Sequence, residues 1–111
     1  MLPADIRLRS STDIALTMRR GTKYSSRLIV LHVVREVSAS TKVAFAVGKS
    51  VGNSVVRHRT TRRLRHIVAK DLSRFPVGSY VVVRALPGTA AATFAELEEN
   101  VNFALTKVVA A

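Results

Sequence analysis

Apolar and polar positions follow two different periods along this chain, one typical of helices and one typical of strands. The longest helical pattern follows Gly52-Asn53, where the glycine indicates a turn and the asparagine side chain can cap the first helical turn. The apolar side of this helix consists of Val56, Thr60, Leu64, Ile67 and Val68. The pattern predicts a long central helix that runs to about Ser73 and packs this side against the core.

A helix is also predicted near each end of the chain. Ser10, followed three residues later by Asp13, can cap a helix from Thr12 to Arg20, which ends at the following glycine. Thr93 and Glu96 form a capping-box pattern at the start of a closing helix. The apolar positions of that helix recur at three- and four-residue steps, at Phe94, Leu97, Val101, Leu105 and Val108.

Three stretches have the composition or the alternation of strands. Arg27 to Arg35 is rich in β-branched and large aliphatic residues, and Tyr80 to Arg84 has the same character. Lys42 to Val47 alternates larger apolar residues with small ones, so its accessible face has room for a ligand. We interpret Val37 to Thr41 as a hairpin loop between the first two strands. The order of elements predicts an α+β fold with helices packed on a small sheet.

The chain is strongly basic, which narrows the classes of partner. Its 111 residues include 18 Lys or Arg and 7 Asp or Glu, for a net charge of +11, and no acidic residue lies between Glu36 and Asp71. A field of one sign points to a polyanion, either nucleic acid or an anionic membrane. The membrane is the weaker reading, because no apolar run approaches the roughly 20 residues that a spanning helix needs.

Chain length and cysteine content limit the number of domains and the cellular compartment. The chain suits a single domain over 1–111, large enough to bury a core and too short for two. The N-terminus lacks the apolar stretch of a signal peptide, and there is no cysteine for a disulfide or a thiolate metal site. We therefore expect a cytoplasmic protein with no membrane partner and no obligate protein partner.

The positive charge is concentrated in the central helix and the turn before it. Residues 49–66 contain Lys49 and five arginines with no acid among them. The side of the helix away from the core carries His58, Arg59, Arg62, Arg63, Arg65 and His66. Guanidinium groups offer planar, forked donors that match phosphate oxygens. An ordinary solvated face mixes both signs of charge, and this one does not, so we favour a nucleic-acid-binding surface.

Residues for catalysis are scarce. The chain has no cysteine nucleophile, no HExxH pair and no glycine-rich phosphate loop. Metal-dependent nucleases usually gather carboxylates around divalent ions, and the seven acids here show no such spacing. The sequence predicts a protein that binds RNA or DNA rather than one that cuts it.

The arginine-rich stretch also resembles a known family. The pattern Lys49-x-x-Gly52-Asn53-x-x-x-Arg57-x-Arg59-x-x-Arg62-x-x-Arg65 is similar to the signature of the protein subunit of bacterial ribonuclease P. Arg7-Leu8-Arg9, followed by Asp13 and Gly21, resembles that family's opening segment. The resemblance covers nearly the whole chain, with the strands in the expected places.

This resemblance implies both a fold and a function. The fold would be a small mixed sheet packed by helices, like the second domain of ribosomal protein S5, with a long arginine-rich central helix. The protein would assist a ribonucleoprotein endonuclease whose catalytic RNA subunit removes the 5′ leader from precursor tRNA, with Mg²⁺ held mainly by the RNA. No catalytic residue would lie on the protein. The residues implied or expected to contact the catalytic RNA are Lys49, Asn53, Arg57, Arg59, Arg62, Arg63 and Arg65.

The resemblance also implies a cleft for the leader between the first helix and the sheet, at Ile14, Met18 and His32. The family often has aromatic residues at these positions, whereas Ile14 and Met18 have no ring on which a base can stack. Leader binding would then depend more on basic side chains such as Lys42 and on the sheet backbone. Ile14 and Met18 also fit ordinary packing against the core, and the sequence leaves both readings open.

Two other classes of function compete with the ribonuclease P cofactor. A ribosomal or other structural RNA-binding protein would use the same fold and charge. A stand-alone nuclease or a DNA regulator with a helix in the groove would need a catalytic cluster or a helix-turn-helix pairing, and neither is recognisable.

Overall fold

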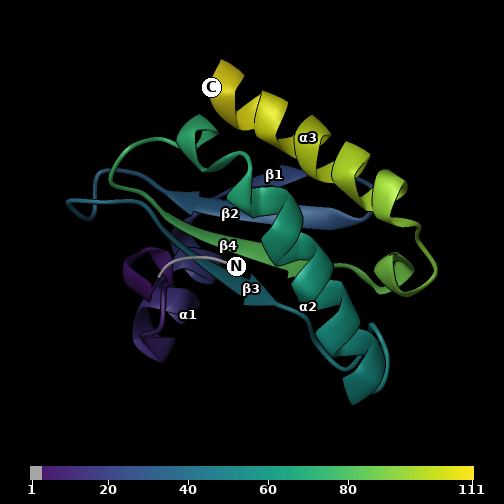
Figure 1. Cartoon of the computed structure of the whole chain (residues 1–111). Coiled ribbons are helices and arrows are strands. Elements are labelled where there is room, and N and C mark those ends of the chain that lie inside the picture. The colour runs from purple at the N-terminus through teal and green to yellow at the C-terminus, as the bar shows by residue number, and fades with distance from the viewer. Residues whose placement is uncertain (1–3) are drawn as a thin grey trace.

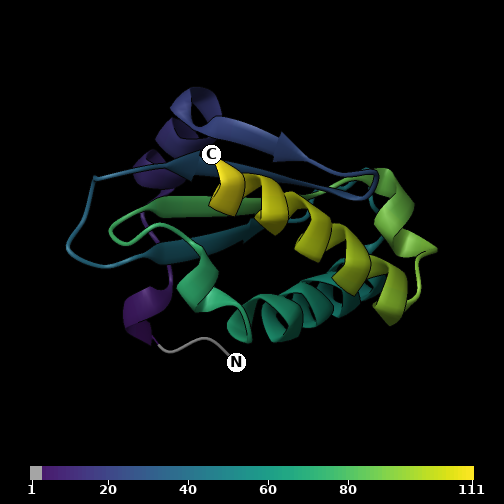
Figure 2. The ribbon, with the colours of Figure 1, turned by 90° about the horizontal axis from the view of Figure 1, so that it is seen from above.

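A mixed β-sheet separates one helix from two others in the computed structural model, which describes residues 4–111 (Figure 1). The strands are β1 (Thr22–Ser25), β2 (Ile29–Val34), β3 (Lys42–Ala46) and β4 (Tyr80–Ala85), in the order β1-β2-β4-β3. The helices are α1 (Ser11–Arg20), α2 (Ser54–Ala69) and α3 (Phe94–Ala110), with 3-10 turns η1 (Ala4–Ile6), η2 (Leu72–Arg74) and η3 (Pro87–Ala90). The view from above shows α1 on one face of the sheet and α2 and α3 on the other (Figure 2).

The predicted helix starts are confirmed by their caps. Asn53 Oδ1 accepts a hydrogen bond from Val56 N at 3.0 Å, which begins α2. Thr93 and Glu96 form a reciprocal capping box at the start of α3. Because these signals depend on neighbouring residues alone, the sequence predicted them with little error.

Two apolar clusters lie on the two faces of the sheet. The larger one joins the sheet to α2 and α3 and includes the fully buried Leu31, Leu64, Val83 and Leu105. The smaller one joins the sheet to α1 and consists of Leu8, Ala44 and Val82, with Ile14, Met18, Ala46 and Tyr80 packed against it. The alternation predicted for β3 is confirmed, because its residues divide between the two clusters.

The predicted hairpin between the first two long strands is wrong. β2 and β3 are not neighbours, since β4 lies between them, antiparallel to β2 and parallel to β3. The sequence carried a sign of this arrangement, because Val81, Val82 and Val83 are consecutive apolar residues. All three are fully buried, as a central strand covered on both faces requires. Residues 37–41 therefore connect strands that belong to opposite sides of β4.

Two further predictions need correction. β1 was not predicted, because Thr-Lys-Tyr-Ser is a short, mostly exposed edge strand with little apolar pattern. The central helix ends at Ala69 rather than near Ser73. Lys70 N and Asp71 N bond to carbonyls three residues back, so the helix tightens into a turn and continues as η2.

Candidate nucleic-acid interface

The outer side of α2 forms a basic, shallow hollow of about 560 Å³. Its lining consists of Val55, His58, Thr61, Arg62 and Arg65. Val55 is 74% exposed and contributes an apolar side chain to this lining beside the two arginines. We call this surface the outer arc of α2. It carries no acidic side chain and suits a phosphate backbone.

The other residues predicted to contact RNA at the start of α2 are spread around its first turns. Lys49 is exposed on the turn that precedes the helix. Asn53 is exposed too, but its side-chain oxygen is already used for the cap, which leaves its amide N–H groups for a ligand. Arg57 is half-buried, and its Nε has no hydrogen-bond partner among residues 4–111.

Arg59 and Arg63 differ from the rest of the predicted set, because they face the segment that leads into α3. Arg59 Nη2 donates to the carbonyl of Ala90 at 3.0 Å, and Arg63 Nη1 donates to the carbonyl of Ala92 at 3.2 Å. Both side chains are half-buried. The arginines of α2 are therefore not equivalent, although their spacing in the sequence does not distinguish them.

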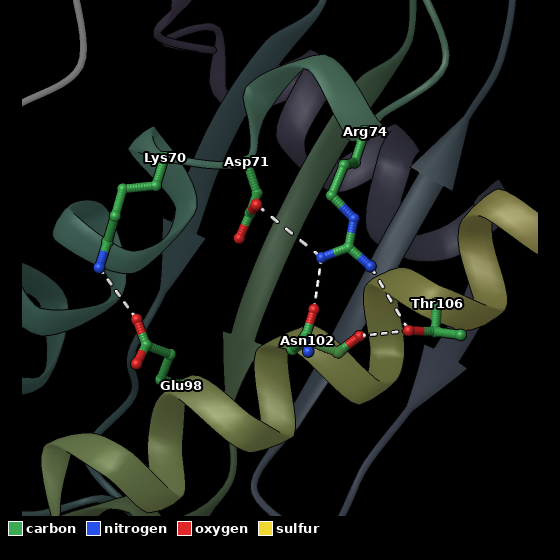
Figure 3. Close-up of polar contacts among 6 residues, drawn as sticks. All are labelled: Lys70, Asp71, Arg74, Glu98, Asn102 and Thr106. Atoms are coloured by element: carbon green, nitrogen blue, oxygen red, sulfur yellow. Dashed lines mark hydrogen bonds and ion pairs between the residues drawn. The ribbon is translucent and has the colours of Figure 1, made fainter.

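The same flank of α2 continues as a polar seam against α3. The ring of His66 lies 5.8 Å from that of Phe94, and Lys70 Nζ lies 2.9 Å from Glu98 Oε2. Figure 3 shows how η2 extends this seam, with Arg74 directed toward Asn102 and Thr106 of α3 and paired with Asp71. Glu98 of α3 thus meets a basic group of the protein itself, whereas the lining of the outer arc of α2 contains no acidic side chain.

A second hollow, of about 230 Å³, lies between α1, β3 and the N-terminal segment. It is lined by Arg7, Leu8, Arg9, Ile14, Val43, Ala44, Phe45 and Arg65. The N-terminal segment is held along β3 by the bond from Leu8 N to Val43 O at 2.9 Å. We call this hollow the cleft. Arg65 lines both the cleft and the outer arc, so the two surfaces meet at one side chain.

The predicted leader-binding residues differ in exposure, and among them Ile14 alone lines this cleft. Ile14 and Met18 are half-buried one helical turn apart on α1, where both pack against the smaller apolar cluster, and Ile14 also lines the cleft. Lys42 is half-buried at the start of β3, and its Nζ donates to the carbonyl of Asp5 at 3.1 Å. Ile14 is therefore the better placed of the two apolar residues to touch a ligand.

His32 lies on the same face of the sheet but is covered. It is 2% exposed, and its Nε2 accepts a hydrogen bond from Arg84 Nε at 3.1 Å. Burial lowers the pKa of His32 below its ordinary value, and the positive charges of Arg84 and Lys23 lower this pKa further, against a weaker opposite effect from the main chain of Met18. The ring is thus neutral at pH 7 and orients Arg84, and a base cannot stack on it in this arrangement.

The neutral state of His32 makes the stability of the fold depend on pH. Because its folded pKa lies below the unfolded value of about 6.5, the unfolded chain takes up a proton first as the pH falls. The free energy of unfolding should therefore decrease as the pH drops below about 6.5. His32→Gln keeps an acceptor for Arg84 but cannot titrate, so its unfolding free energy should decrease less over pH 7.5 to 5. Urea denaturation of both proteins tests this, and an equal decrease in both would contradict it.

Three basic residues near the cleft were missed as site residues. Arg7 and Arg9 line the cleft, and Arg84 lies beside His32 on the face of β4 that carries Val82. The sequence held a signal for Arg84, because it lies two residues after Val82 and four after Tyr80 in a strand and so shares their face. Arg7 and Arg9 follow no regular pattern, and only the pairing of their segment with β3 brings them to the cleft.

Comparisons with known proteins identify the family. The profile of the protein family described as Ribonuclease P matches residues 2–109. A ribonuclease P protein component from Streptomyces bikiniensis is 41% identical over 118 residues, which cover 98% of this chain and 96% of that protein. The chain belongs to the ribonuclease P protein family. Another ribonuclease P protein component, from Acidothermus cellulolyticus, is 46% identical over 99 residues, 87% of this chain and 82% of that protein.

Solved structures of ribonuclease P proteins share the fold. The Staphylococcus aureus protein at 2.0 Å superposes with a TM-score of 0.80 at 19% identity, covering 94% of this chain and 97% of that one. The Thermotoga maritima protein gives a TM-score of 0.78 at 18% identity, covering 95% and 96%. The predicted fold class is confirmed. Membership of the ribonuclease P family assigns the chain a role in 5′ maturation of tRNA together with an RNA subunit, and it decides against the ribosomal, nuclease and DNA-regulator alternatives.

No helix within residues 4–111 is long and apolar enough to cross a membrane. In the same part of the chain, no group of three or more His, Cys, Asp or Glu side chains is placed to hold a metal ion.

Proposed function

We propose that the chain binds the catalytic RNA of ribonuclease P through the outer arc of α2 and holds the 5′ leader of precursor tRNA in the cleft. The observation that carries this proposal is the position of Arg65, which lines both hollows. A side chain shared by two adjoining basic surfaces suits a protein that joins two RNA molecules. The whole chain would act as one RNA-binding unit in the cytoplasm, the compartment expected from its bacterial relatives.

Within this proposal the chemistry belongs to the RNA subunit. Mg²⁺ would be held mainly by the RNA, where it would supply the charge stabilisation that phosphodiester hydrolysis needs. The described residues of the protein gather no group of His, Cys, Asp or Glu side chains suited to hold a metal ion. The protein would position the leader and neutralise phosphates with Lys49, Arg57, Arg62 and Arg65, and with Arg59 and Arg63 at the flank. The neutral Asn53 would donate a hydrogen bond from its amide.

The test is cleavage of precursor tRNA at low Mg²⁺, with a transcribed ribonuclease P RNA from Streptomyces bikiniensis. The protein alone should leave the substrate intact, the RNA alone should cleave slowly, and the two together should release the leader at the 5′ junction. Lysozyme, another small basic protein, at equal concentration controls for charge alone. Leader removal by the protein without RNA, surviving nuclease treatment of the preparation, would overturn the proposal, and so would the absence of any stimulation.

A substitution at Ile14 tests the leader cleft. Stacking of a base on an aromatic ring is worth roughly 1–3 kcal/mol, and Ile14 is a half-buried residue that lines the hollow without a ring. Ile14→Phe should therefore tighten binding of precursor tRNA by about tenfold, the lower part of that range, and leave binding of mature tRNA unchanged. Fluorescence titration of labelled tRNAs with and without a leader measures both.

Two controls separate the cleft from the core. Ile14→Leu conserves volume without adding a ring and should have little effect on either tRNA. Met18→Phe, one turn further along α1, should tighten leader binding less, because Met18 does not line the hollow. Loss of stability in Ile14→Phe with weaker leader binding would mean that this residue is part of the core.

A further inference from the structure

The arginine-rich surface of α2 is divided into two arcs. Arg59, Arg63, His66 and Lys70 recur at steps of four, three and four residues, which places them along one flank of the helix. Each member of this flank contacts the segment before α3 or α3 itself. Arg62, in contrast, is exposed on the outer arc and makes no hydrogen bond to any of residues 4–111. The two kinds of arginine alternate along one helix but have different surroundings.

The partners of Arg59 and Arg63 are fixed main-chain groups. Ala90 is the last residue of η3 and Ala92 lies between η3 and α3, and we call residues 90–92 the connector. The two alanines can offer a guanidinium only their carbonyls. The connector is anchored on both sides. Thr89 is buried with its Oγ1 bonded to the carbonyl of Leu86 at 2.9 Å, and Thr93 is locked in the capping box of α3. The carbonyls therefore act as rigid acceptors rather than as parts of a mobile loop.

Each of these guanidinium groups keeps N–H donors that the protein does not use. A guanidinium has five N–H groups in a planar fork, and each carbonyl takes one of them. Arg59 Nε is buried without a partner in the described part of the chain, so its terminal nitrogens form the edge left for a ligand. Arg63 contributes only Nη1 to its carbonyl, which leaves Nε and Nη2, the side edge that matches two phosphate oxygens.

We propose that the carbonyls of Ala90 and Ala92 pre-orient Arg59 and Arg63, so that these two side chains act as directional phosphate contacts that set the register of the RNA on α2. The inference rests on the proposed function, because it specifies how the same surface meets its RNA. An arginine whose plane is already fixed loses less side-chain entropy when it binds than a free one does. Arg62, which has no such tether, contributes mainly its charge.

Lysine substitutions separate geometry from charge. Lysine keeps the positive charge and the long stem, but a single ammonium cannot hold a carbonyl and present a planar fork to a phosphate. Arg59→Lys and Arg63→Lys should each weaken binding of transcribed ribonuclease P RNA about tenfold. The matched control, Arg62→Lys, should weaken it less than about threefold. The slope of log affinity against log salt should stay the same in all three, because this slope counts charges.

The full-length protein is used throughout, with filter binding at several salt concentrations and far-UV circular dichroism to confirm folding. Equal losses of affinity in Arg63→Lys and Arg62→Lys would overturn the inference, because the tether would then be irrelevant. A lower unfolding temperature in Arg63→Lys with unchanged RNA affinity would overturn it too, since the contact would serve the fold alone. If Arg59→Lys fails to fold, the difference in RNA affinity between Arg63→Lys and Arg62→Lys tests the inference. This experiment measures RNA binding and not cleavage. A protein that fails to stimulate cleavage would therefore contradict the proposed function, while the RNA affinities of the lysine variants could still be compared.

Discussion

Gly21→Ala should destabilise the fold by about 3 kcal/mol, the upper range for forcing an extra methyl group into packed surroundings. Gly21 follows α1 and adopts an extended conformation that alanine also tolerates, so the expected loss comes from space. A Cβ at this position would lie 2.4 Å from the carbonyl oxygen of Thr17 and 3.0 Å from Val33 N. Both are main-chain atoms, which cannot turn away as the end of a flexible side chain can.

The matched control for this substitution is Gly48→Ala. No atom lies within 4 Å of a Cβ built at Gly48, so the same change there should be neutral or slightly stabilising. Urea denaturation gives the free energy of unfolding of both variants. Because relief of the contact at Gly21 would push α1 away from β2, Gly21→Ala should also weaken binding of leader-bearing tRNA at the cleft. Equal stability of the two variants would mean that α1 can shift without cost.

The helices could be predicted from the sequence because their signals are local. A cap such as Asn53 or Thr93 bonds to an amide three residues away, and an apolar stripe repeats within the same segment. The end of α2 was harder to predict, because residues 70–74 remain helical in a tighter form. The polar residues of that stretch serve the seam with α3, which no local pattern reveals.

The order of the strands could not be predicted in the same way. Strand pairing is a contact between distant segments, and the sequence of β3 does not record whether β2 or β4 lies beside it. The buried run Val81–Val83 is typical of a central strand, but the prediction paired consecutive strands instead. β1 was missed because a short edge strand needs little apolar surface.

For the candidate site, the sequence predicted a basic surface but not the surroundings of single side chains. Spacing alone placed the arginines away from the core. The structure agrees for the exposed Arg62, whereas Arg59 and Arg63 are half-buried against the segment before α3. Spacing could not distinguish Arg59 from Arg62, because the difference depends on a connector about 30 residues further along the chain. Likewise, the family resemblance placed His32 in the leader cleft, but only the packing of the folded chain determines that its ring is covered.

Replacing Arg62 and Arg65 together with alanine should weaken binding of ribonuclease P RNA about a hundredfold. A hydrogen bond to a charged group contributes about 1.5 kcal/mol at the lower end of its range, which corresponds to roughly tenfold in affinity for each arginine. Both side chains line the outer arc, where residues 4–111 place no acidic partner, so each should release counterions when it meets a phosphate. The slope of log affinity against log salt should therefore become shallower by nearly one unit for each arginine removed.

The single variants separate the two surfaces that meet at Arg65. Arg62→Ala should weaken binding of the catalytic RNA but not binding of leader-bearing precursor tRNA. Arg65→Ala should weaken binding of both, because Arg65 lines the cleft as well as the outer arc. Lys107→Ala removes the same charge from the exposed side of α3 and should change neither affinity by more than about twofold, as expected for a distant surface charge. Filter binding over a range of salt concentrations gives the affinity for each RNA and its salt slope. Urea denaturation gives the free energy of unfolding of each variant. If Arg62→Ala lowers the free energy of unfolding and leaves the salt slope unchanged, Arg62 stabilises the fold and does not bind RNA. If Lys107→Ala and Arg62→Ala weaken RNA binding equally, the RNA responds to net charge rather than to the outer arc.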